Sequence, residues 1–149
     1  MLTVAGCSRA VGAPSEPPSD DAVAAEIVAL HDFFTQWFRG ERPNDDAGFA
    51  RFPEALAPGF VIVSPTGVLS ERDRVLAGVR GAHGSWAAAD AIRIESVTVR
   101  LRTADTIVAT YEEWQRRGGD GERGRLSTVV FDHALQWRHV HETWLPVTE

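Results

Sequence analysis

Four consecutive segments in the second half of the chain place apolar residues at positions with a period of two, most clearly in the first segment. They cover residues 92–101, 106–117, 125–131 and 135–145. Successive side chains on a β-strand point to opposite faces, so this period predicts four long strands connected as hairpins. In the first segment the apolar positions change parity between Glu95 and Ser96, which predicts a β-bulge that bends the sheet. Such a sheet needs other elements to cover its apolar face.

The first half of the chain shows the period of an α-helix. Apolar residues recur every three or four positions from Val23 to Phe38. Ser19 can cap the start of this helix, and Gly40 can end it. The remaining elements that we expect are a short helix around 49–56, a strand over 60–64, and a third helix from a capping box at 70–73 to about 83–84. We therefore predict an α+β fold in which three helices pack on one face of a curved, mostly antiparallel sheet and enclose a cone-shaped pocket.

Length and charge narrow the functions that the chain can have. Its 149 residues favour a single domain. Its formal net charge of −6 disfavours a nucleic-acid partner, because nucleic acids are bound largely through Lys and Arg. Residues 1–19 are small, Pro-rich and aperiodic, so we assign them to a flexible N-terminal arm and residues 20–149 to the domain. We expect no membrane-spanning segment.

The arm also bears on localisation. Cys7, the only cysteine, follows the small residues of a pattern typical of bacterial lipoprotein cleavage sites. A working signal needs a charged start and roughly 7–15 apolar residues, which this arm lacks. We therefore expect a cytoplasmic protein. The alternative is a lipid-anchored envelope protein whose start codon lies upstream and whose Cys7 carries the lipid.

The last strand carries the residues best suited to acid–base chemistry. On an unbroken strand, Trp137, His139 and His141 share one face, and we expect that face to point into the pocket. Imidazole titrates near neutral pH, so His139 and His141 are the candidate catalytic residues. The alternative is a purely structural role for both. A metal site would need a third ligand such as His31 or Glu113, which no spacing supplies, so we expect no metal and no cofactor.

The preceding hairpin adds charged and aromatic residues to the expected pocket. Tyr111 and Glu113 share one face of their strand, and Arg125 lies across the hairpin from them. The Arg–Glu pair is either a solvated structural pair at the pocket rim or an anchor for an anion or carbonyl group of a ligand. The other ligand-binding candidates are His31, Trp37, Phe60, Trp137 and Trp86, the last in a loop from which it could act as a lid.

Four stretches of the chain carry a family resemblance. They are residues 33–38 (FFTQWF), 56–67 (LAPGFVIVSPTG), 124–131 (GRLSTVVF) and 137–143 (WRHVHET). In these stretches the chain resembles the nuclear transport factor 2-like superfamily, in particular its SnoaL-like (polyketide-cyclase-like) branches and the association domain of calmodulin-dependent kinase. The resemblance covers roughly residues 22–146. It implies a cone-shaped α+β fold with an internal pocket, and a homodimer joined through the sheets.

The resemblance does not select one activity, because this fold hosts both enzymes and binding modules. The isomerase members need a carboxylate base together with a tyrosine and a protonated acid, and Tyr111 is the only tyrosine. We therefore expect a homodimeric domain that binds a small molecule of unknown identity in a half-polar pocket. One alternative is a cofactor-free lyase, isomerase or cyclase that uses His139 or His141 as general acid or base. Another is a dimerisation or assembly module with a vestigial pocket and an interface at Val140 and Trp144.

Overall fold

The computed structural model describes residues 16–119 and 121–147 of the chain. Its helices are α1 (Asp20–Phe38), α2 (Asp46–Phe49), α3 (Arg51–Ala55) and α4 (Arg72–Gly81). Its strands are β1 (Leu56–Val63), β2 (Leu69–Glu71), β3 (Ala91–Arg102), β4 (Thr106–Arg116), β5 (Glu122–Asp132) and β6 (Trp137–Trp144). Most of the predicted N-terminal arm, including Cys7, lies outside the described residues. None of the described helices is long and apolar enough to cross a membrane.

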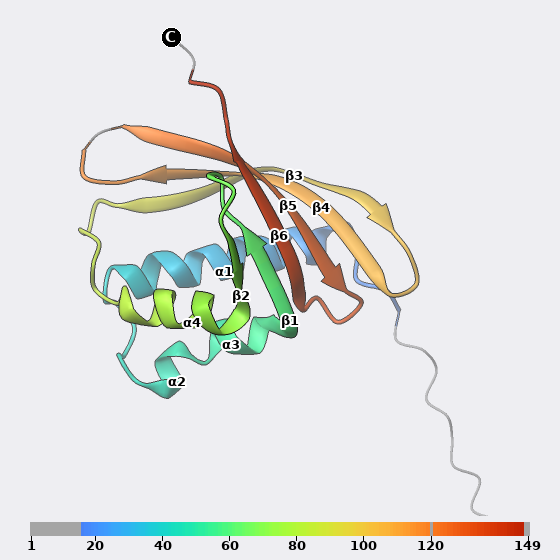
Figure 1. Ribbon diagram of the computed structural model, residues 1–149, viewed down its shortest axis with the longest axis horizontal. Helices are drawn as coiled ribbons and strands as arrows, with labels where there is room; N and C mark the ends of the chain where they lie inside the picture. The colour runs from blue at the N-terminus through green and yellow to red at the C-terminus, as the bar shows by residue number, and fades with distance from the viewer. Residues whose placement is uncertain (1–15, 120, 148–149) are drawn as a thin grey trace, which may run out of the picture.

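The six strands form one sheet in the order β2-β1-β6-β5-β4-β3. Strands β1 and β6 run parallel, and every other neighbouring pair is antiparallel. Figure 1 shows the described helices together on one side of this sheet, with the other side left uncovered. The predicted α+β architecture is therefore confirmed, because the helices pack on one face of a mostly antiparallel sheet.

Helix α1 forms where its pattern predicts. The Ser19 hydroxyl accepts a hydrogen bond from the Ala22 amide at 3.1 Å. Gly40 follows the helix with a φ of 74°, a left-handed conformation that glycine adopts without strain. Phe33 and Trp37 are four positions apart and share a face, and both contact aromatic rings of the short helices that follow.

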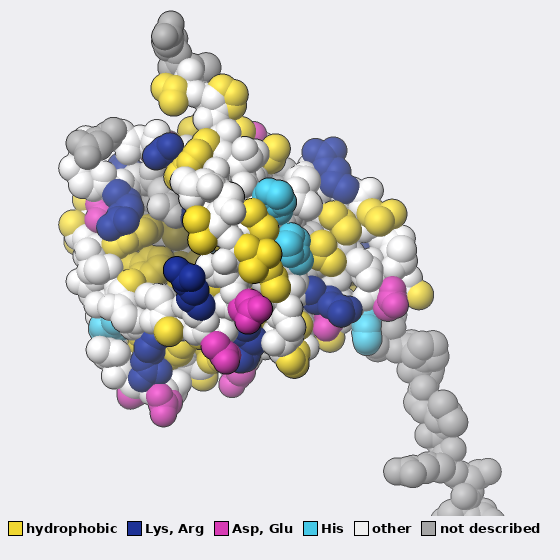
Figure 2. All heavy atoms as spheres, in the orientation of Figure 1, with side chains coloured by type: hydrophobic (Ala, Val, Ile, Leu, Met, Phe, Trp, Pro, Cys, Tyr) yellow, Lys and Arg dark blue, Asp and Glu magenta, His cyan; other side chains and the backbone are white. Residues whose placement is uncertain are grey.

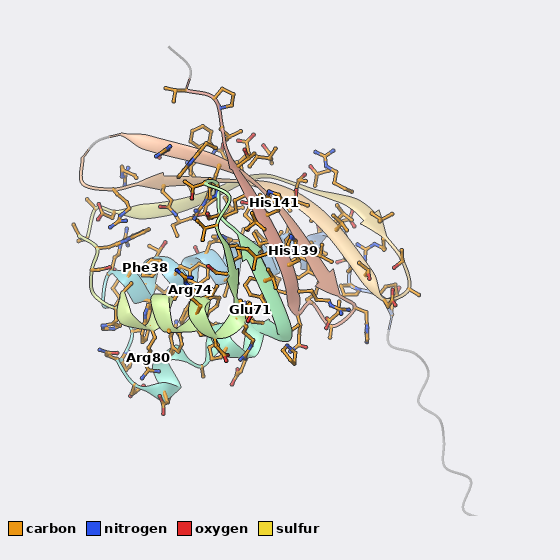
Figure 3. The ribbon with its side chains drawn as sticks, in the orientation of Figure 1. Phe38, Glu71, Arg74, Arg80, His139 and His141 are labelled. Carbon is orange, nitrogen blue, oxygen red and sulfur yellow. The ribbon has the colours of Figure 1, made fainter. Side chains whose placement is uncertain are left out.

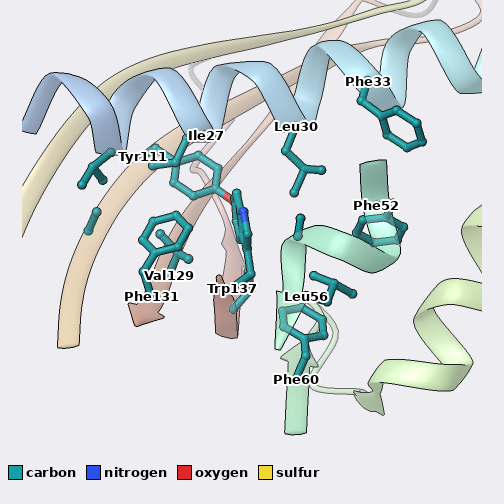
Figure 4. Close-up of a cluster of buried hydrophobic side chains, with 14 of the residues drawn as sticks. Ile27, Leu30, Phe33, Phe52, Leu56, Phe60, Tyr111, Val129, Phe131 and Trp137 are labelled. Atoms are coloured by element: carbon teal, nitrogen blue, oxygen red, sulfur yellow. The ribbon is translucent and has the colours of Figure 1, made fainter. Parts of the chain in front are cut away.

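The core lies between α1 and the inner face of the sheet (Figure 4). Ile27 and Leu30 of α1 face Phe131 and Trp137 of the sheet, and none of these side chains is more than 2% exposed. The rings of Phe131 and Trp137 meet edge to face, with their centroids 4.8 Å apart. Each such side chain stabilises the fold by about 1.5–3 kcal/mol on burial, so this cluster fixes α1 on the sheet.

Strand β3 contains the predicted bulge and a second register shift between Val99 and Leu101, and four features of other elements differ from the prediction. Ser96 lies at a register shift in the pairing with β4 and has a φ of 55°. The N-cap of α4 is Glu71 rather than Ser70, and no side chain caps it. Residues Leu69–Glu71 form an unpredicted strand, β2, which pairs with β1. The expected second helix is two short helices, and β1 begins at Leu56, earlier than predicted.

Strand β6 contains a further bulge, which the sequence pattern did not indicate. Trp137 pairs with Phe131 on β5, and His139 pairs with Val130. Trp137 and His139 are two positions apart on β6, whereas their partners Phe131 and Val130 are adjacent on β5, so Arg138 is the extra residue. One extra residue moves every later side chain of the strand to the opposite face.

The bulge corrects the predicted orientation of β6. Val140 and Glu142 face the helices and are 4% and 6% exposed. His141 is exposed and His139 is half-buried, both on the opposite face. The prediction that the odd-numbered face points inward is therefore right for Trp137 and wrong for both histidines. The prediction that Val140 points outward is wrong for the same reason.

Candidate functional site

A cavity of about 520 Å³ lies between the helices and the inner face of the sheet. Its apolar walls include Phe34, Phe38, Phe60, Val75, Val79 and Trp86. Its polar end is formed by His31, Tyr111, Glu113, Gln115, Arg125 and Glu142. Figure 2 shows a hollow with hydrophobic side chains at its base between α4 and the sheet, and Figure 3 labels Phe38 in this region. The cavity is thus apolar at one end and ionisable at the other.

The periods of a helix and of a strand bring the polar residues together. On α1, His31 and Phe34 are three positions apart, so both can face the cavity. On β4, Tyr111 and Glu113 are two positions apart, and each is 2% exposed. Arg125 on β5 is the direct pairing partner of Glu113. The hairpin between β4 and β5 therefore places the buried acid beside its cation.

Glu113 has protein partners at both carboxylate oxygens. Its Oε1 accepts hydrogen bonds from Arg125 Nη2 and Gln115 Nε2, each at 2.6 Å. Its Oε2 lies 3.2 Å from His31 Nε2. Burial by itself would raise the pKa of Glu113, but the hydrogen bond and charge of His31 and the charge of Arg125 together hold that pKa well below its usual range. Glu113 is therefore an ionised anchor for its neighbours.

His31 lies between two hydrogen-bond acceptors. Its Nδ1 is 2.7 Å from the carbonyl oxygen of Ile27, and its Nε2 faces the Glu113 carboxylate. An imidazole nitrogen donates only when it carries a proton, so forming both hydrogen bonds requires the cationic ring. The ring also packs edge-on against Tyr111, with centroids 5.3 Å apart. These contacts fix the orientation of His31 at the cavity wall.

Glu142 differs from Glu113 because one of its oxygens is free. Its Oε2 accepts a hydrogen bond from Arg125 Nη1 at 3.1 Å, while no described residue donates to its Oε1. Burial raises the pKa of Glu142 to about 7; the charge of Arg125 opposes this rise and that of Glu113 adds to it. Glu142 can therefore gain or lose a proton near neutral pH while it faces the cavity.

Trp86 is part of the cavity wall. Its amide donates to the Phe38 carbonyl at 2.8 Å, and its ring centroid lies 4.9 Å from that of Phe38. The Arg117 guanidinium lies 5.0 Å from the centroid of the Trp86 ring. The carboxylate of the nearby Asp90 accepts hydrogen bonds from the backbone amides of Gly118 and Ala87. These two bonds lower the pKa of Asp90, and the bond from Gly118 has the larger effect. The loop around Trp86 is therefore held by hydrogen bonds on both sides.

Most of the predicted ligand-binding residues come together at this cavity. The residues that line it are His31, Phe60, Trp86, Tyr111, Glu113, Arg125 and Trp137. Trp37 does not line the cavity, because it lies in the core and its Nε1 donates to the Val79 carbonyl at 2.7 Å. The Arg–Glu pair is not a solvated rim pair, since the Glu113 side chain is only 3% exposed.

The two candidate catalytic histidines lie outside the cavity. Figure 3 labels His139 and His141 on β6, and Figure 2 shows them next to each other on the molecular surface. Neither can act on a ligand inside the cavity, so the proposed acid–base role for them is wrong there. Glu142, which the bulge turns inward, was not predicted from the sequence as a cavity residue. Gln115 was not among the predicted site residues either, although its position two residues after Glu113 indicates the same face.

The ligand set considered for a metal does not assemble. His31 and Glu113 line the cavity, whereas His139 and His141 lie on the other face of the sheet. Within residues 16–119 and 121–147, no group of three or more His, Cys, Asp or Glu side chains is arranged to hold a metal ion. The polar end is instead an arrangement of ion pairs and hydrogen bonds.

Comparison with known proteins identifies the family. Residues 23–146 match the family described as "Sucrose-6-phosphate phosphohydrolase C-terminal". The chain belongs to this family. Among curated proteins, Sucrose-phosphatase 1 of Nicotiana tabacum is 26% identical over 130 residues, which are 82% of this chain and 30% of the relative. The chain thus spans less than a third of that relative's length.

Solved structures similar to this family member confirm the nuclear transport factor 2-like fold. One is a nuclear transport factor 2-like protein of unknown function from Pseudomonas aeruginosa, with a TM-score of 0.73 and 24% identity. The match covers 83% of this chain and 98% of that protein. Another is a Thiobacillus denitrificans protein assigned as a calcium/calmodulin-dependent protein kinase type II association domain, with a TM-score of 0.58 and 19% identity. That match covers 87% of this chain and 97% of that protein.

Proposed function

We propose that this chain binds a small amphipathic molecule in the cavity between the helices and the sheet. The observation that carries the proposal is a cavity of about 520 Å³ whose walls are apolar and whose polar end holds a buried carboxyl group, Glu142, with a free oxygen. Small-molecule sites are commonly concave, enclose roughly 300–1,000 Å³, and combine apolar walls with a few polar groups. The cavity matches this description in size and in lining.

The buried charges support binding over a purely structural role. Two glutamates, an arginine and a histidine from four elements meet at one end of the cavity. A buried ion pair stabilises a fold no better than well-packed apolar side chains of similar volume, and an empty cavity lowers stability. A ligand that fills the cavity and contacts these charges accounts for both features.

Ligand-observed NMR on the intact chain tests this proposal. The panel contains small aromatic and alicyclic compounds with different polar groups, and it includes sugars because the curated relative is a sucrose-phosphatase. Ile62 of β1 is half-buried and lines the cavity, so Ile62→Trp should fill the space. We expect compounds that bind the wild type, fail to bind Ile62→Trp, and still bind the control His141→Ala on the opposite face. The proposal fails if the wild type binds nothing, or if a folded Ile62→Trp binds equally well.

A second candidate function is self-assembly through the outer face of the sheet. Outward residues of β1, β5 and β6 form one patch there, made of Val61, Val63, Thr128, Val130, His139 and His141. The patch is continuous, since Val63 and Thr128 both pair with His141. Of the two residues first assigned to an interface, Trp144 is exposed and Val140 is buried on the inner face. The similarity to a protein assigned as an association domain supports a homodimer joined through this face.

Sedimentation velocity tests the assembly candidate. Val130→Lys places a charge in the middle of the outer patch, so we expect a wild-type dimer and a variant monomer of 16.3 kDa. The control is Val28→Lys on the solvent side of α1, where Val28 is already 41% exposed. A monomeric wild type, or a dimer that persists in Val130→Lys, would rule out assembly through this face.

A further inference from the structure

We propose that the cavity is selective for an organic cation, an apolar body that carries a protonated amine, with the amine bound at Glu142. This inference rests on the ligand-binding function proposed above and adds the chemical class of the ligand. It follows from the hydrogen-bond donors that are already occupied, from the acceptors that are free, and from the aromatic walls.

Most hydrogen-bond donors at the polar end of the cavity already contact protein acceptors. Arg125 donates from Nη2 to Glu113 and from Nη1 to Glu142. Its Nε is buried and has no hydrogen-bond partner. The Gln115 amide nitrogen donates to Glu113, and His31 faces Glu113 and a backbone carbonyl of α1. An anionic ligand would have to take its hydrogen bonds from the remaining N–H groups of Arg125 and Gln115, which lie beside the Glu113 and Glu142 carboxylates that repel it.

By contrast, one hydrogen-bond acceptor at the polar end of the cavity is free. No described residue donates a hydrogen bond to Glu142 Oε1, and the Glu142 side chain is 6% exposed and lines the cavity. Gln115 presents its amide oxygen, since its nitrogen is held by Glu113. A ligand that donates hydrogen bonds therefore matches the polar end. A protonated amine matches it better than an alcohol, because a hydrogen bond between two charged groups is roughly twice as strong as a neutral one.

The walls suit a cation that is attached to an apolar body. Phe34 and Phe38 stack with centroids 6.0 Å apart, and Trp86 continues this aromatic surface. The face of an aromatic ring attracts a cation, as the position of Arg117 over Trp86 shows. Arg117 is exposed and is the cavity-lining cation best placed to attract an anion. The experiment therefore includes an anionic probe.

The experiment measures the dissociation constants of benzylamine, benzyl alcohol and benzoate for the intact chain by NMR titration. The three probes share one ring and differ in the polar group. We expect benzylamine to bind at least tenfold more tightly than benzoate at pH 8, with benzyl alcohol between them. Glu142→Gln keeps the shape of the side chain and removes its charge, so the preference for the amine should disappear. Glu142→Asp keeps the charge at a shorter reach and should preserve the order of the probes with weaker binding.

The pH dependence identifies the group that binds the amine. Glu142 is faced by Arg125 from β5, Glu113 and Tyr111 from β4, and His31 from α1. With a pKa of about 7, Glu142 is about one-tenth ionised at pH 6 and about nine-tenths ionised at pH 8. Benzylamine stays protonated across this range, so its affinity should rise severalfold, up to about ninefold, between these pH values. Glu142→Gln should remove the rise, whereas titration of another residue would leave it in place.

The outcomes separate this inference from the binding function on which it rests. If no probe and no panel compound binds the wild type, the proposed function fails and the inference fails with it. If the probes bind but benzoate is tightest, or all three bind equally, only the selectivity for a cation fails. The same holds if Glu142→Gln, shown to be folded by its circular dichroism spectrum, keeps the preference for the amine.

Discussion

Glu142→Gln should change how the stability of the protein depends on pH. The pKa of Glu142 is about 7 in the folded protein, above its ordinary value of 4.5. The folded state therefore holds the proton more tightly than the unfolded chain does. The contribution of this group to stability is complete below about pH 4.5 and is lost as the pH rises through about 7. Glutamine does not titrate, so position 142 of the variant adds no pH dependence to the free energy of unfolding over this range.

The size of the effect follows from the two pKa values. They differ by about 2.5, and each pKa unit corresponds to about 1.4 kcal/mol, so the wild type should lose about 3 kcal/mol relative to the variant between pH 4.5 and pH 8. The physical cause is burial, because the ionised carboxylate has only Arg125 as a hydrogen-bonding partner and lies near the Glu113 carboxylate. Glutamine can keep the hydrogen bond from Arg125.

Urea denaturation followed by tryptophan fluorescence measures the effect. The free energy of unfolding of both proteins is determined at several values between pH 4.5 and pH 8.5. The difference, variant minus wild type, should increase with pH and level off above about pH 8. Carbon-13 NMR of the Glu142 carboxyl group should show a transition near pH 7 in the native wild type. A difference that stays constant across the range, or a transition below pH 5, would refute the reasoning.

Four further substitutions, one of them a control, test other contacts, each by urea denaturation at pH 7. Glu113→Gln leaves buried cations without their carboxylate and should cost about 3–5 kcal/mol; a loss below about 1 kcal/mol would contradict the anchoring role. Gly124→Ala puts a Cβ 2.8 Å from the indole of the neighbouring strand and should lower the free energy of unfolding by about 1–3 kcal/mol. The control is Gly78→Ala in α4, where the Cβ meets nothing within 4 Å, and it should raise the free energy of unfolding by about 0.5–1 kcal/mol. Trp37→Phe removes the donor to the Val79 carbonyl and should cost about 1–3 kcal/mol; an unchanged midpoint would count against that bond.

Local patterns in the sequence were enough to predict the elements whose partners are close in the chain. The start of α1 depends on one side chain, Ser19, which bonds to a residue three positions away. The placement of Glu113 beside Arg125 depends on one hairpin, so the period of its two strands predicts it. Trp37 shows the limit of this approach. Its position on the apolar side of α1 was evident, but the choice between core and cavity depends on α2 and α4, which are distant in sequence.

The bulges at Ser96 and Arg138 differ in whether the sequence can reveal them. In β3 the apolar residues change parity at the bulge, so the irregularity is visible in the pattern. In β6 both faces mix apolar and polar residues, and an extra residue at Arg138 leaves no trace in the alternation. Glu142 then takes an inward position that a histidine would hold on a regular strand. A buried glutamate is stable there because Arg125, distant in sequence, supplies its charge partner. The presence of Glu142 at the polar end of the cavity therefore depends on a long-range ion pair, which local sequence periodicity cannot predict.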